Sequence, residues 1–273
     1  MLYIPIHNMN LNIIIVWYNE EPNISKLFKH LEYLKSKVDC RIIYVDQESI
    51  DNSVDLMKKW GAEVYIHPNK WYADPDKKWV VEELCKNGER CFILDCDEEF
   101  NNHLADTICW IMEEDEDGKC YSVLRKTEFL WKNVAEARQL RLFKKESVIL
   151  TLDVHNYIKP ADGVKHIHLK EYIDEIDLKL KWQWVRFLIN KNNNYSDKEL
   201  DKIWNISTFK VILLMIWMPI LWFFWRWIVH KNFLRWWTWI IHCTLQAQYQ
   251  FRIYAKLYEK IRIQKAKKHK RQS

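Results

Sequence analysis

Apolar residues in about the first hundred positions come in short runs that alternate with amphipathic stretches. Four runs rich in β-branched residues predict strands at residues 11–17, 41–46, 62–67 and 90–95. The stretches 23–34, 51–61 and 74–88 have the apolar spacing of helices, with Asn23 as a predicted N-cap and Gly61 and Gly88 as predicted ends. Strands that alternate with helices predict an α/β fold, in which a mainly parallel sheet has helices on both faces.

The C-terminal part has a different pattern, with an uncharged run of fifteen residues from Val211 to Trp225. As a helix this run would measure about 22 Å at ~1.5 Å per residue, which is less than a bilayer core of roughly 30 Å. Pro219 stands in its middle. We therefore predict a bent helix pair that lies in or dips into one leaflet, rather than a straight transmembrane helix. The alternative is a buried helical hairpin that caps the first domain.

Composition also separates the two ends of the chain, which has 16 Trp and 4 Gly in 273 residues. All the glycines lie within the first 163 residues, whereas half of the tryptophans fall between Trp204 and Trp239. This contrast places a domain boundary near residues 165–175. We take residues 1–165 as the α/β domain and residues 166–273 as a helical, Trp-rich extension that is associated with a membrane.

The residue types of this extension favour the interface between lipid and water. Its tryptophans are interleaved with Arg226, Lys231 and Arg235, and both kinds of side chain settle at the level of lipid headgroups. The basic tail at residues 256–271 would add attraction to anionic lipid, at roughly 1 kcal/mol for each well-placed charge. The sequence thus predicts a cytoplasmic protein with peripheral or monotopic attachment to the cytoplasmic face of a membrane.

Charge and cysteine content argue against several other classes of protein. The formal net charge of +5 gathers in the tail without a recognisable nucleic-acid motif, so no nucleic-acid partner is expected. The seven cysteines include no CxxC pair, which favours reduced, buried thiols over zinc or disulfides. No basic region precedes the first apolar run, so no signal peptide is expected. Neither GxGxxG nor GxxxxGK(S/T) is present, which argues against a dinucleotide fold and a P-loop.

Acidic and amide side chains follow three of the four predicted strands. They are Asn19, Glu20 and Glu21 after the first strand, Asp46, Glu48 and Asp51 after the second, and Asp95, Asp97, Glu98 and Glu99 after the fourth. The carboxyl ends of parallel strands meet at one edge of a sheet, and ligands bind there. Carboxylates at such an edge repel one another unless a cation lies among them. The sequence therefore predicts a cation or a cationic ligand at this edge.

Asp95 and Asp97 are two residues apart, a spacing that points both side chains to the same side of an extended chain. Their carboxylates can hold one hard divalent ion, whose other positions are filled by water and substrate phosphate. We predict that they bind Mg²⁺ or Mn²⁺ and that this ion bridges the pyrophosphate of a sugar nucleotide. The alternative is a solvated acidic loop, because such triplets also occur by chance.

Several of these motifs resemble those of the family 2 glycosyltransferases, which have the GT-A fold. The chain has NEE after the first strand, VDQESIDNSV at residues 45–54 where the family has VD-x-G-S-x-D-N-T, and LDCDEEF where the family has L-D-A-D-E. Four further segments, RLFKK, DVHNYI, HIHLKEY and LQAQYQFRIYAKLYE, are similar to the lipopolysaccharide core β-glucosyltransferases and their relatives. The resemblance covers nearly the whole chain, and the last segment is the part most specific to that subgroup.

The resemblance implies roles for residues at the acidic edge. Asp46 would bind the nucleobase, because a carboxylate can accept a hydrogen bond from a uracil N–H, and Asn19 and Glu20 would lie nearby at the nucleoside. Asp95 would face ribose and metal. Asp97 would be the principal metal ligand and, through the metal, a catalytic residue.

The resemblance also singles out residues further along the chain. Arg141 would contact phosphate or acceptor, because its planar guanidinium suits phosphate oxygens. His155 would position substrate, with a packed core histidine as the alternative. His166 and His168 alternate along a predicted strand, but two histidines without a third ligand are weak evidence for a metal site.

Two departures from the family pattern affect the predicted chemistry. Glu48 stands where the family has a small Gly in the nucleotide loop. Asn156 stands where the subgroup has a Glu that could serve as general base, and an amide cannot accept a proton in that role. Asp153 is the nearest substitute base, with a solvated turn carboxylate as its alternative, and Glu98 and Glu99 are further candidates.

The sequence thus predicts a metal-dependent inverting glycosyltransferase. It would move a hexose from a nucleotide diphosphate sugar, UDP-linked in the favoured version, to a glycan or glycolipid acceptor such as a lipopolysaccharide-core-like saccharide. A retaining transferase and a nucleotidyltransferase are the rival enzymes. The rival outside enzymes is a catalytically impaired scaffold that binds sugar nucleotide or glycan, and the residues at positions 48 and 156 motivate it.

Overall fold

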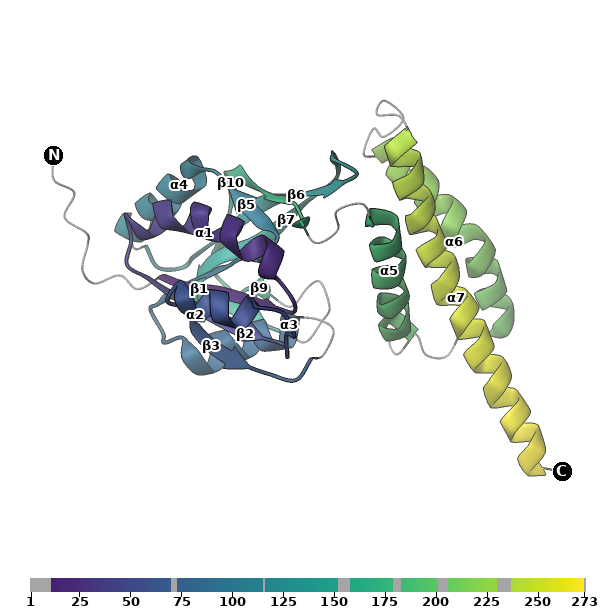
Figure 1. Ribbon diagram of the computed structural model, residues 1–273. Helices are drawn as coiled ribbons and strands as arrows, with labels where there is room; N and C mark the ends of the chain where they lie inside the picture. The colour runs from purple at the N-terminus through teal and green to yellow at the C-terminus, as the bar shows by residue number, and fades with distance from the viewer. Residues whose placement is uncertain are drawn as a thin grey trace. The chain divides into compact units, whose positions relative to one another are not determined.

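The computed structural model describes residues 11–69, 73–114, 116–151, 158–178, 183–200, 206–229 and 237–272 (Figure 1). The chain divides into two compact units. Unit 1 comprises Met1–Glu128 and Glu136–Lys179, and unit 2 comprises Phe129–Ala135 and Leu180–Ser273. The second stretch of unit 1 therefore ends at residue 179, whereas the composition of the sequence placed the domain boundary near residues 165–175.

Unit 1 is built on an eight-stranded mixed sheet with the order β3-β2-β1-β4-β7-β6-β10-β5. The strands are β1 (Leu11–Trp17), β2 (Cys40–Asp46), β3 (Glu63–Ile66), β4 (Arg90–Ile93), β5 (Glu98–Phe100), β6 (Lys119–Phe129), β7 (Lys132–Lys144) and β10 (Lys165–Glu175). β1 pairs in parallel with β2 and β4, and β2 pairs in parallel with β3. β7 and β5 run antiparallel to β4 and β10, respectively. The four strands predicted from the sequence are confirmed, and they form the parallel half of the sheet.

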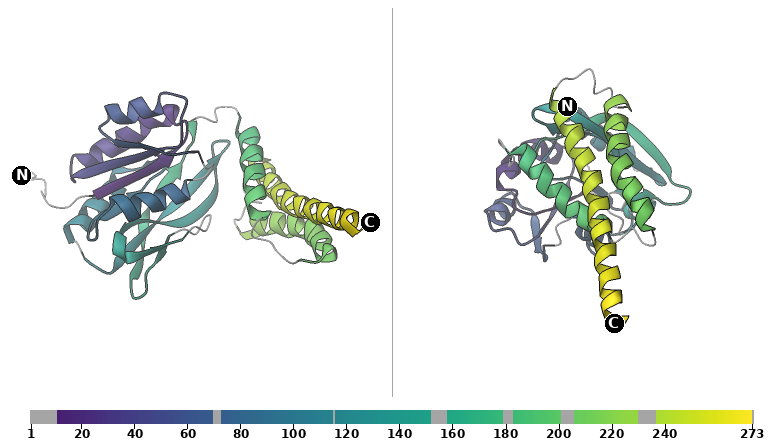
Figure 2. Two further views of the ribbon diagram at one scale, coloured as in Figure 1. Left: turned by 90° about the horizontal axis from the view of Figure 1, so that it is seen from below. Right: turned by 90° about the vertical axis from the view of Figure 1, so that its right-hand side faces the viewer.

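Helices and a small second sheet complete unit 1. They are α1 (Glu21–Lys35), α2 (Ser53–Lys59), α3 (Asp74–Trp79), a π-helical turn (Val80–Leu84), α4 (Asn102–Glu114), a 3₁₀ turn (Lys145–Ser147) and the antiparallel pair β8 (Val148–Leu150) and β9 (Ile158–Pro160). Helices lie on both faces of the sheet, as Figures 1 and 2 show. The predicted α/β architecture is therefore confirmed.

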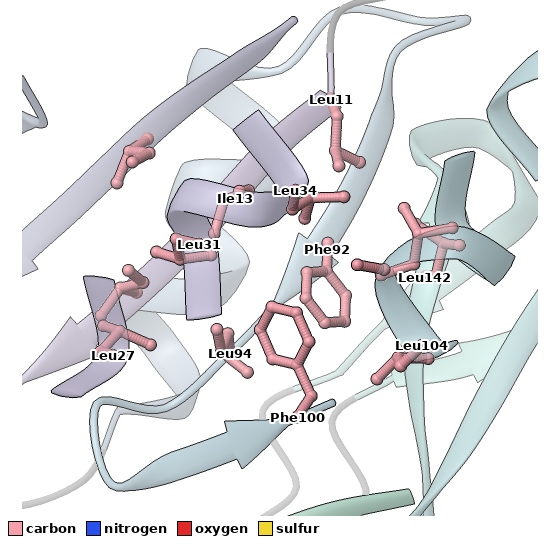
Figure 3. Close-up of a cluster of buried hydrophobic side chains, with 14 of the residues drawn as sticks. Leu11, Ile13, Leu27, Leu31, Leu34, Phe92, Leu94, Phe100, Leu104 and Leu142 are labelled. Carbon is pink, nitrogen blue, oxygen red and sulfur yellow. The ribbon is translucent and has the colours of Figure 1, made fainter. Parts of the chain in front are cut away.

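Strand β1 is buried on both faces, because its side chains alternate between two apolar clusters. Leu11, Ile13 and Ile15 pack in the cluster that also contains residues of α1 and α4 (Figure 3). Ile14 and Val16 pack in the other cluster, together with residues of the π-helical turn. A strand between two layers of helices needs apolar residues on both sides, which explains its continuous apolar run.

The first helix begins before Asn23, so the predicted N-cap was wrong. α1 starts at Glu21, directly after Glu20, and Pro22 in its first turn favours that start. Asn23 is buried within the helix, where its Nδ2 donates to Glu20 Oε2 (2.6 Å) and to Asp177 Oδ1 (3.0 Å). The amide group of Asn23 is thus used to hold two carboxylates, not to cap the helix.

The third helix is shorter than the sequence predicted. It passes into the π-helical turn and ends at Leu84, and Cys85 is already extended. Lys145 Nζ donates to the carbonyl oxygens of Glu82 (2.5 Å) and Cys85 (2.9 Å), which satisfies acceptors that the end of a helix leaves open. This contact comes from a residue sixty positions away, so the local pattern up to Gly88 could not reveal it.

The described part of unit 2 consists of the helices α5 (Trp184–Leu200), α6 (Thr208–Val229) and α7 (Trp237–Gln272), and α7 packs against the other two (Figure 2). A small core joins Phe129 and Val134 to Trp184 of α5 and to Trp239 and Leu245 of α7. Lys256 Nζ ties α7 to α5, since it donates to Asn193 Oδ1 (2.9 Å), Ser196 Oγ (2.8 Å) and Asp197 Oδ1 (2.6 Å). The predicted C-terminal helices are therefore present.

Helix α6 is longer than the uncharged run on which its predicted length was based. The helix continues through Pro219, and its apolar part extends over Thr208–Ile228, 21 residues with a mean hydropathy of 1.8. At ~1.5 Å per residue this is about 32 Å, so the argument that the segment is too short to cross a bilayer was wrong. Only 6% of its most apolar window is buried. Among the described residues it is the one helix that could cross a membrane by length and composition.

Replacing Lys256 with Met removes the ammonium group that joins α7 to α5. We expect the backbone amides of α5 to exchange with solvent about fivefold faster, which corresponds to ~1 kcal/mol for partly exposed, charge-assisted hydrogen bonds. Lys265→Met removes the hydrogen bond to Thr208 Oγ1 (2.9 Å) at the far end of α7 and is the matched control. Hydrogen-exchange mass spectrometry checks the difference, and equal exchange of α5 in the two variants would contradict it.

Candidate functional site

The loops after β1 and β2 are held together by side chains at their tips. Asn19 donates its backbone N–H to Ser49 Oγ (2.8 Å), and its Oδ1 accepts from the N–H of Ile50 (2.9 Å). The N–H of Glu21 donates to Asp51 Oδ2 (3.1 Å), and the N–H of Glu20 donates to Ser53 Oγ (2.7 Å). These contacts fix the carboxyl end of β1 against that of β2. Asn19 has a φ of 52°, a conformation that Asn tolerates better than most residues.

Asp46 lies buried at the end of β2, where it shapes the loop that follows. Its Oδ1 accepts from the hydroxyl of Tyr44 (3.0 Å), and its Oδ2 accepts from the N–H of Ser49 (2.7 Å). A carboxylate has about four lone-pair sites, so these two hydrogen bonds leave lone pairs over, and the residue is 1% exposed. Glu48 in the same loop has a φ of 60°, and its Oε2 accepts from the N–H of Asn69 (3.2 Å).

Asp95 follows β4, and the chain's own cations neutralise its carboxylate. Lys77 Nζ donates to its Oδ1 (2.5 Å), and Arg141 Nη2 lies 3.7 Å from its Oδ2. Burial alone would raise the pKa of Asp95, but the charges of Lys77 and Arg141 outweigh this effect and hold the pKa well below its usual range. Asp95 is therefore ionised and already paired.

Asp97 lies on the turn between β4 and β5 and, unlike Asp95, has no cation beside it among the residues that the structure describes. The residue is 9% exposed, and its backbone oxygen accepts from the N–H of Ile176 (2.7 Å). No hydrogen bond or ion pair reaches its carboxylate from the part of the chain that the structure describes. Burial raises the pKa of Asp97 well above its usual value, and the negative charges of Glu175, Glu20, Asp95 and Asp177 raise it further.

Glu98 and Arg141 form a buried pair beside Asp95. Arg141 Nη2 donates to Glu98 Oε1 and to Gln139 Oε1, and its Nη1 donates to the carbonyl oxygen of Ile93 (3.2 Å). Burial raises the pKa of Glu98 to about 7, although the guanidinium of Arg141 opposes the rise. Glu98 Oε2 also accepts from the N–H of Asp95 (2.9 Å). Arg141, expected to contact phosphate or acceptor, thus lies buried and supports the turn that carries Asp95 and Asp97.

Several residues of the site were missed in the sequence, and α3 carries two of them. Lys77, 5% exposed, binds Asp95, and its neighbour Asp76 accepts from Gln47 Nε2 (2.7 Å) and hydrogen-bonds His67 Nδ1 (3.0 Å). A signal was present, because Lys77 shares a helical face with the apolar residues at positions 80 and 81. The first turn of α3 therefore brings one cation and one anion to the carboxyl edge of the sheet.

Glu175 and Asp177 were also missed, since they lie beyond the predicted α/β domain. Glu175 ends β10 directly opposite Glu98 of β5, accepts from Thr127 Oγ1 (2.6 Å) and lies 3.6 Å from Arg125 Nε. Asp177 follows two residues later and is held by Asn23. The end of β10 thus adds two carboxylates to those that the sequence placed near Asp97.

A separate polar pocket of about 470 Å³ lies on the other face of β5 and β10. Its lining consists of His30, Glu99, Phe100, Asn101, Asn102, His103, Tyr172 and Asp174. Glu99 and Asp174 alternate with Glu98 and Glu175 along their strands. Their side chains therefore point away from the carboxylates around Asp97. Glu99 is paired with Lys26 and His30. As a candidate base, Glu99 consequently lies apart from Asp97.

Asp153, His155 and Asn156 are outside the described residues. His166 and His168 lie near the start of β10, at the opposite end of the strand from Glu175, with ring centroids 4.7 Å apart.

The residues around Asp97 fit a divalent cation that substrate helps to hold. The described residues contain no group of three or more His, Cys, Asp or Glu side chains arranged to hold a metal by themselves. Mg²⁺ in enzymes, however, is often bound by one or two carboxylates, with water and substrate phosphate at its other positions. Asp97 supplies a buried carboxylate that no described residue pairs with, and the surrounding negative charge favours a cation.

Comparison with known proteins gives a consistent result. The family model described as "Glycosyl transferase family 2" matches residues 12–173. An uncharacterised glycosyltransferase of Rickettsia typhi is 23% identical over 82% of this chain and 78% of its own length. One of Rickettsia conorii is 24% identical over 82% of this chain and 81% of its own.

Two solved structures are similar to the chain at lower identity. A mannosyltransferase of Pyrobaculum calidifontis in complex with GDP-Man and Mn²⁺ is 12% identical, with a TM-score of 0.48 over 90% of this chain and 73% of its own. S. aureus TarS (residues 1–349) in complex with UDP-GlcNAc is 13% identical, with a TM-score of 0.41 over 93% of this chain and 92% of its own.

Substitution of Glu48 tests the backbone conformation of the loop after β2. Ala normally stabilises a protein relative to Gly by up to ~1 kcal/mol, but a positive φ reverses this order. We expect Glu48→Gly to be more stable than Glu48→Ala by about 1 kcal/mol in urea unfolding. Both variants lose the contact with Asn69, so the difference isolates the backbone effect. The usual order, with Ala more stable, would contradict the prediction.

Lys77→Met leaves the buried carboxylate of Asp95 with less compensation, and we expect a loss of ~3 kcal/mol in the free energy of unfolding. Lys78→Met is the matched control, because its ammonium group is more exposed and lies 3.5 Å from Glu82 Oε1, and it should cost about 0.5 kcal/mol or less. Adding Asp95→Asn to Lys77→Met should recover part of the stability. Urea unfolding measures all three, and equal losses in the two lysine variants would contradict the buried pairing.

Proposed function

The chain belongs to glycosyl transferase family 2, and from that premise we propose that it moves a hexose from a UDP-linked sugar to a glycolipid acceptor. The proposed reaction is a metal-dependent transfer that inverts the anomeric carbon. The acceptor would be a saccharide like that of the lipopolysaccharide core, because the segment LQAQYQFRIYAKLYE resembles the glucosyltransferases that act there. The family membership itself supports a glycosyltransferase.

The observation that carries the proposal is the contrast between the two aspartates of the D-x-D motif. Lys77 and Arg141 neutralise Asp95, whereas Asp97 is buried among carboxylates without a cation from the described chain. A Mg²⁺ or Mn²⁺ ion held by Asp97, with Asp95 beside it, would relieve that repulsion and stabilise the negative charge of the departing diphosphate. Such a site would bind tightly only when substrate phosphate completes it.

The loops after β1 and β2 would hold the nucleoside part of the donor. Asp46 has lone pairs left to accept from a uracil N–H, and its fixed position would make that recognition specific. Asn19 and Glu20 lie on the adjoining loop, and their backbone contacts join the two loops into one surface. In this proposal Asp95 also faces the ribose, while Lys77 and Arg141 position it.

An inverting transfer needs a base that removes the proton from the attacking acceptor hydroxyl. We assign this role to Asp153, since the subgroup's Glu is Asn156 here. The positions of the other two candidates support this choice. Glu98 is buried and paired with Arg141, and Glu99 lines another pocket. His155, two residues after Asp153, would help to position the acceptor.

We further propose that the enzyme works at the cytoplasmic face of a membrane, with peripheral or monotopic attachment. Unit 2 supports this location, since the largely exposed apolar surface of α6 accompanies a basic end of α7. An enzyme attached to the bilayer meets a lipid-linked acceptor at high local concentration.

Calorimetric titration of UDP into the full-length protein tests the donor and metal site. We expect binding with Mn²⁺, and affinity at least about tenfold lower, or 1.4 kcal/mol, when EDTA replaces Mn²⁺ or when Asp97 is replaced with Asn. Asp39→Asn is the matched control, because Asp39 is an exposed carboxylate just before β2, at the opposite end of that strand from the site. If the affinity for UDP stayed the same without Mn²⁺ and in the folded Asp97→Asn variant, the proposal would be contradicted.

Turnover of bound donor then separates the enzyme from a scaffold that binds without transfer. Asp153→Asn should lower the transfer rate by about 100-fold or more while UDP affinity is kept. A scaffold would instead show no transfer, and Asn156→Glu would create it. Product anomeric configuration distinguishes inversion from retention.

A further inference from the structure

The outer side of α6 is apolar along the length of the helix. Its exposed large apolar residues are Phe209, Leu213, Ile216, Trp217, Ile220, Leu221, Phe224, Trp225 and Ile228. They recur at intervals of three and four, so they share one face of the helix. Lys210, in the first turn, is the one charged residue among the exposed side chains that the structure describes on α6.

The apolar face continues from α6 onto α7. A groove of about 390 Å³ between the two helices is lined by Pro219, Ile220, Phe223, Phe224, Thr244, Ala247, Gln248 and Phe251. Trp237, Ile240 and Ile241 extend the exposed apolar surface of α7 toward its first residue. An apolar patch that spans two helices is unusual on a monomeric soluble protein and marks a binding surface.

We propose that this face binds the surface of an anionic phospholipid bilayer and that α6 lies in the plane of one leaflet instead of crossing it. The proposal specifies the membrane attachment within the proposed function and rests on it for the cytoplasmic side. By length alone α6 could cross a bilayer. The packing of α7 against α6, and of α5 against α7, decides between the two orientations.

The register of α6 and α7 places a charged pair at the depth that a crossing helix would reach. Lys265 of α7 reaches Thr208 at the start of α6, and Phe251 of α7 lines the groove with Pro219 in the middle of α6. Lys256 lies between these two points and binds Asp197 (2.6 Å). If α6 crossed the bilayer, this ion pair would lie within the hydrocarbon, where ionised side chains are costly.

Helix α5 adds a second reason. α5 lies along α7, from the core that contains Trp184 and Trp239 to the hydrogen bonds between Lys256 and residues 193–197. α7 lies between α5 and α6 (Figure 2). Residues 190–199 of α5 are almost all polar, with four asparagines. A crossing α6 would carry this polar helix into lipid, whereas an in-plane α6 leaves it in water.

The side chains around the apolar face fit an anionic lipid surface. Trp217, Trp225 and Trp237 are exposed on it, and Trp rings settle at the level of headgroups. Beyond the apolar part of α7, Arg262, Lys265 and Lys267 are exposed and would meet lipid phosphate. The chemistry of the surface therefore combines shallow apolar insertion with attraction to negative charge.

Depth measurements on α6 distinguish the two orientations. Single spin labels at Leu213→Cys, Trp217→Cys, Leu221→Cys and Ile228→Cys are compared on vesicles of phosphatidylcholine with phosphatidylglycerol. The background is Cys40→Ser, because the other six cysteines are buried. An in-plane helix gives similar, shallow depths at all four positions, and a label at Asn190→Cys of α5 stays in water. A depth maximum near Pro219, with shallow labels at both ends of α6, would overturn the proposal.

Vesicle flotation with full-length protein tests the lipid surface itself. Trp217→Glu is compared with Trp110→Glu of α4, since the two tryptophans are 56% and 55% exposed. We expect Trp217→Glu to lower the fraction that floats with anionic vesicles by about tenfold, Trp110→Glu to leave it unchanged, and pure phosphatidylcholine to retain less protein. Equal flotation of the two variants would overturn the proposal.

Two further outcomes separate this proposal from others. If the apolar face instead joined two copies of the chain, the protein would be a dimer in the absence of vesicles, and Trp217→Glu would make it monomeric. Neither form would float with vesicles, and this result would overturn lipid binding. UDP titration of Trp217→Glu should match that of the unsubstituted protein. If neither the unsubstituted protein nor Trp217→Glu bound UDP, while the unsubstituted protein still floated with vesicles, the proposed donor site would be rejected and the proposed lipid surface would be retained.

Discussion

The charge balance at the carboxyl edge of the sheet is the constraint on which the candidate site depends. Asp95 and Glu98 are buried there together with their cations, Lys77 and Arg141, and removal of one partner would leave an uncompensated buried charge. Asp97 is on the same turn, and the described chain brings no cation to it. The fold therefore leaves one negative position open at the place where a parallel sheet binds its ligands.

The different roles of the paired carboxylates and of Asp97 explain why the turn between β4 and β5 and the side chains that contact it are charged. The pairs of Asp95 and Glu98 fix the backbone between β4 and β5, so the carboxylate of Asp97 is held in place although none of the described residues pairs with it. β10 contributes Glu175 and Asp177, which raise the negative potential at Asp97. A preorganised site of this kind favours a cation that arrives with substrate over one held by protein alone.

Local patterns in the sequence were sufficient for the parallel half of the sheet and for the acidic edge. The apolar run of β1 and the position of Asp97 after β4 both follow from periodicity and strand order. Lys77 and Glu175 were not found, because each acts on a carboxylate from another part of the chain and neither stands in a motif. Asn23 was misread as a cap for the same reason, since the carboxylate of Asp177 that it binds lies 154 residues away. The predicted base, Asp153, stays a prediction.

The two units differ in how much of their apolar surface they bury. Unit 1 buries its apolar residues in two clusters on either side of the sheet. Unit 2 buries few of the residues of α6 and instead holds α7 to α5 through Lys256. At the proposed lipid interface an exposed apolar helix would need amphipathic aromatic side chains rather than tight turns, which would account for the uneven distribution of Trp and Gly along the sequence.

The most direct test of the charge argument is a crystal structure with UDP and Mn²⁺, in which the anomalous scattering of manganese locates the ion. The account predicts a peak at roughly 2.1–2.2 Å from a carboxylate oxygen of Asp97, within reach of the UDP phosphates, with Lys77 still bound to Asp95. A manganese ion elsewhere, for example in the pocket of Glu99 and Asp174, or UDP bound without any ion near Asp97, would contradict it.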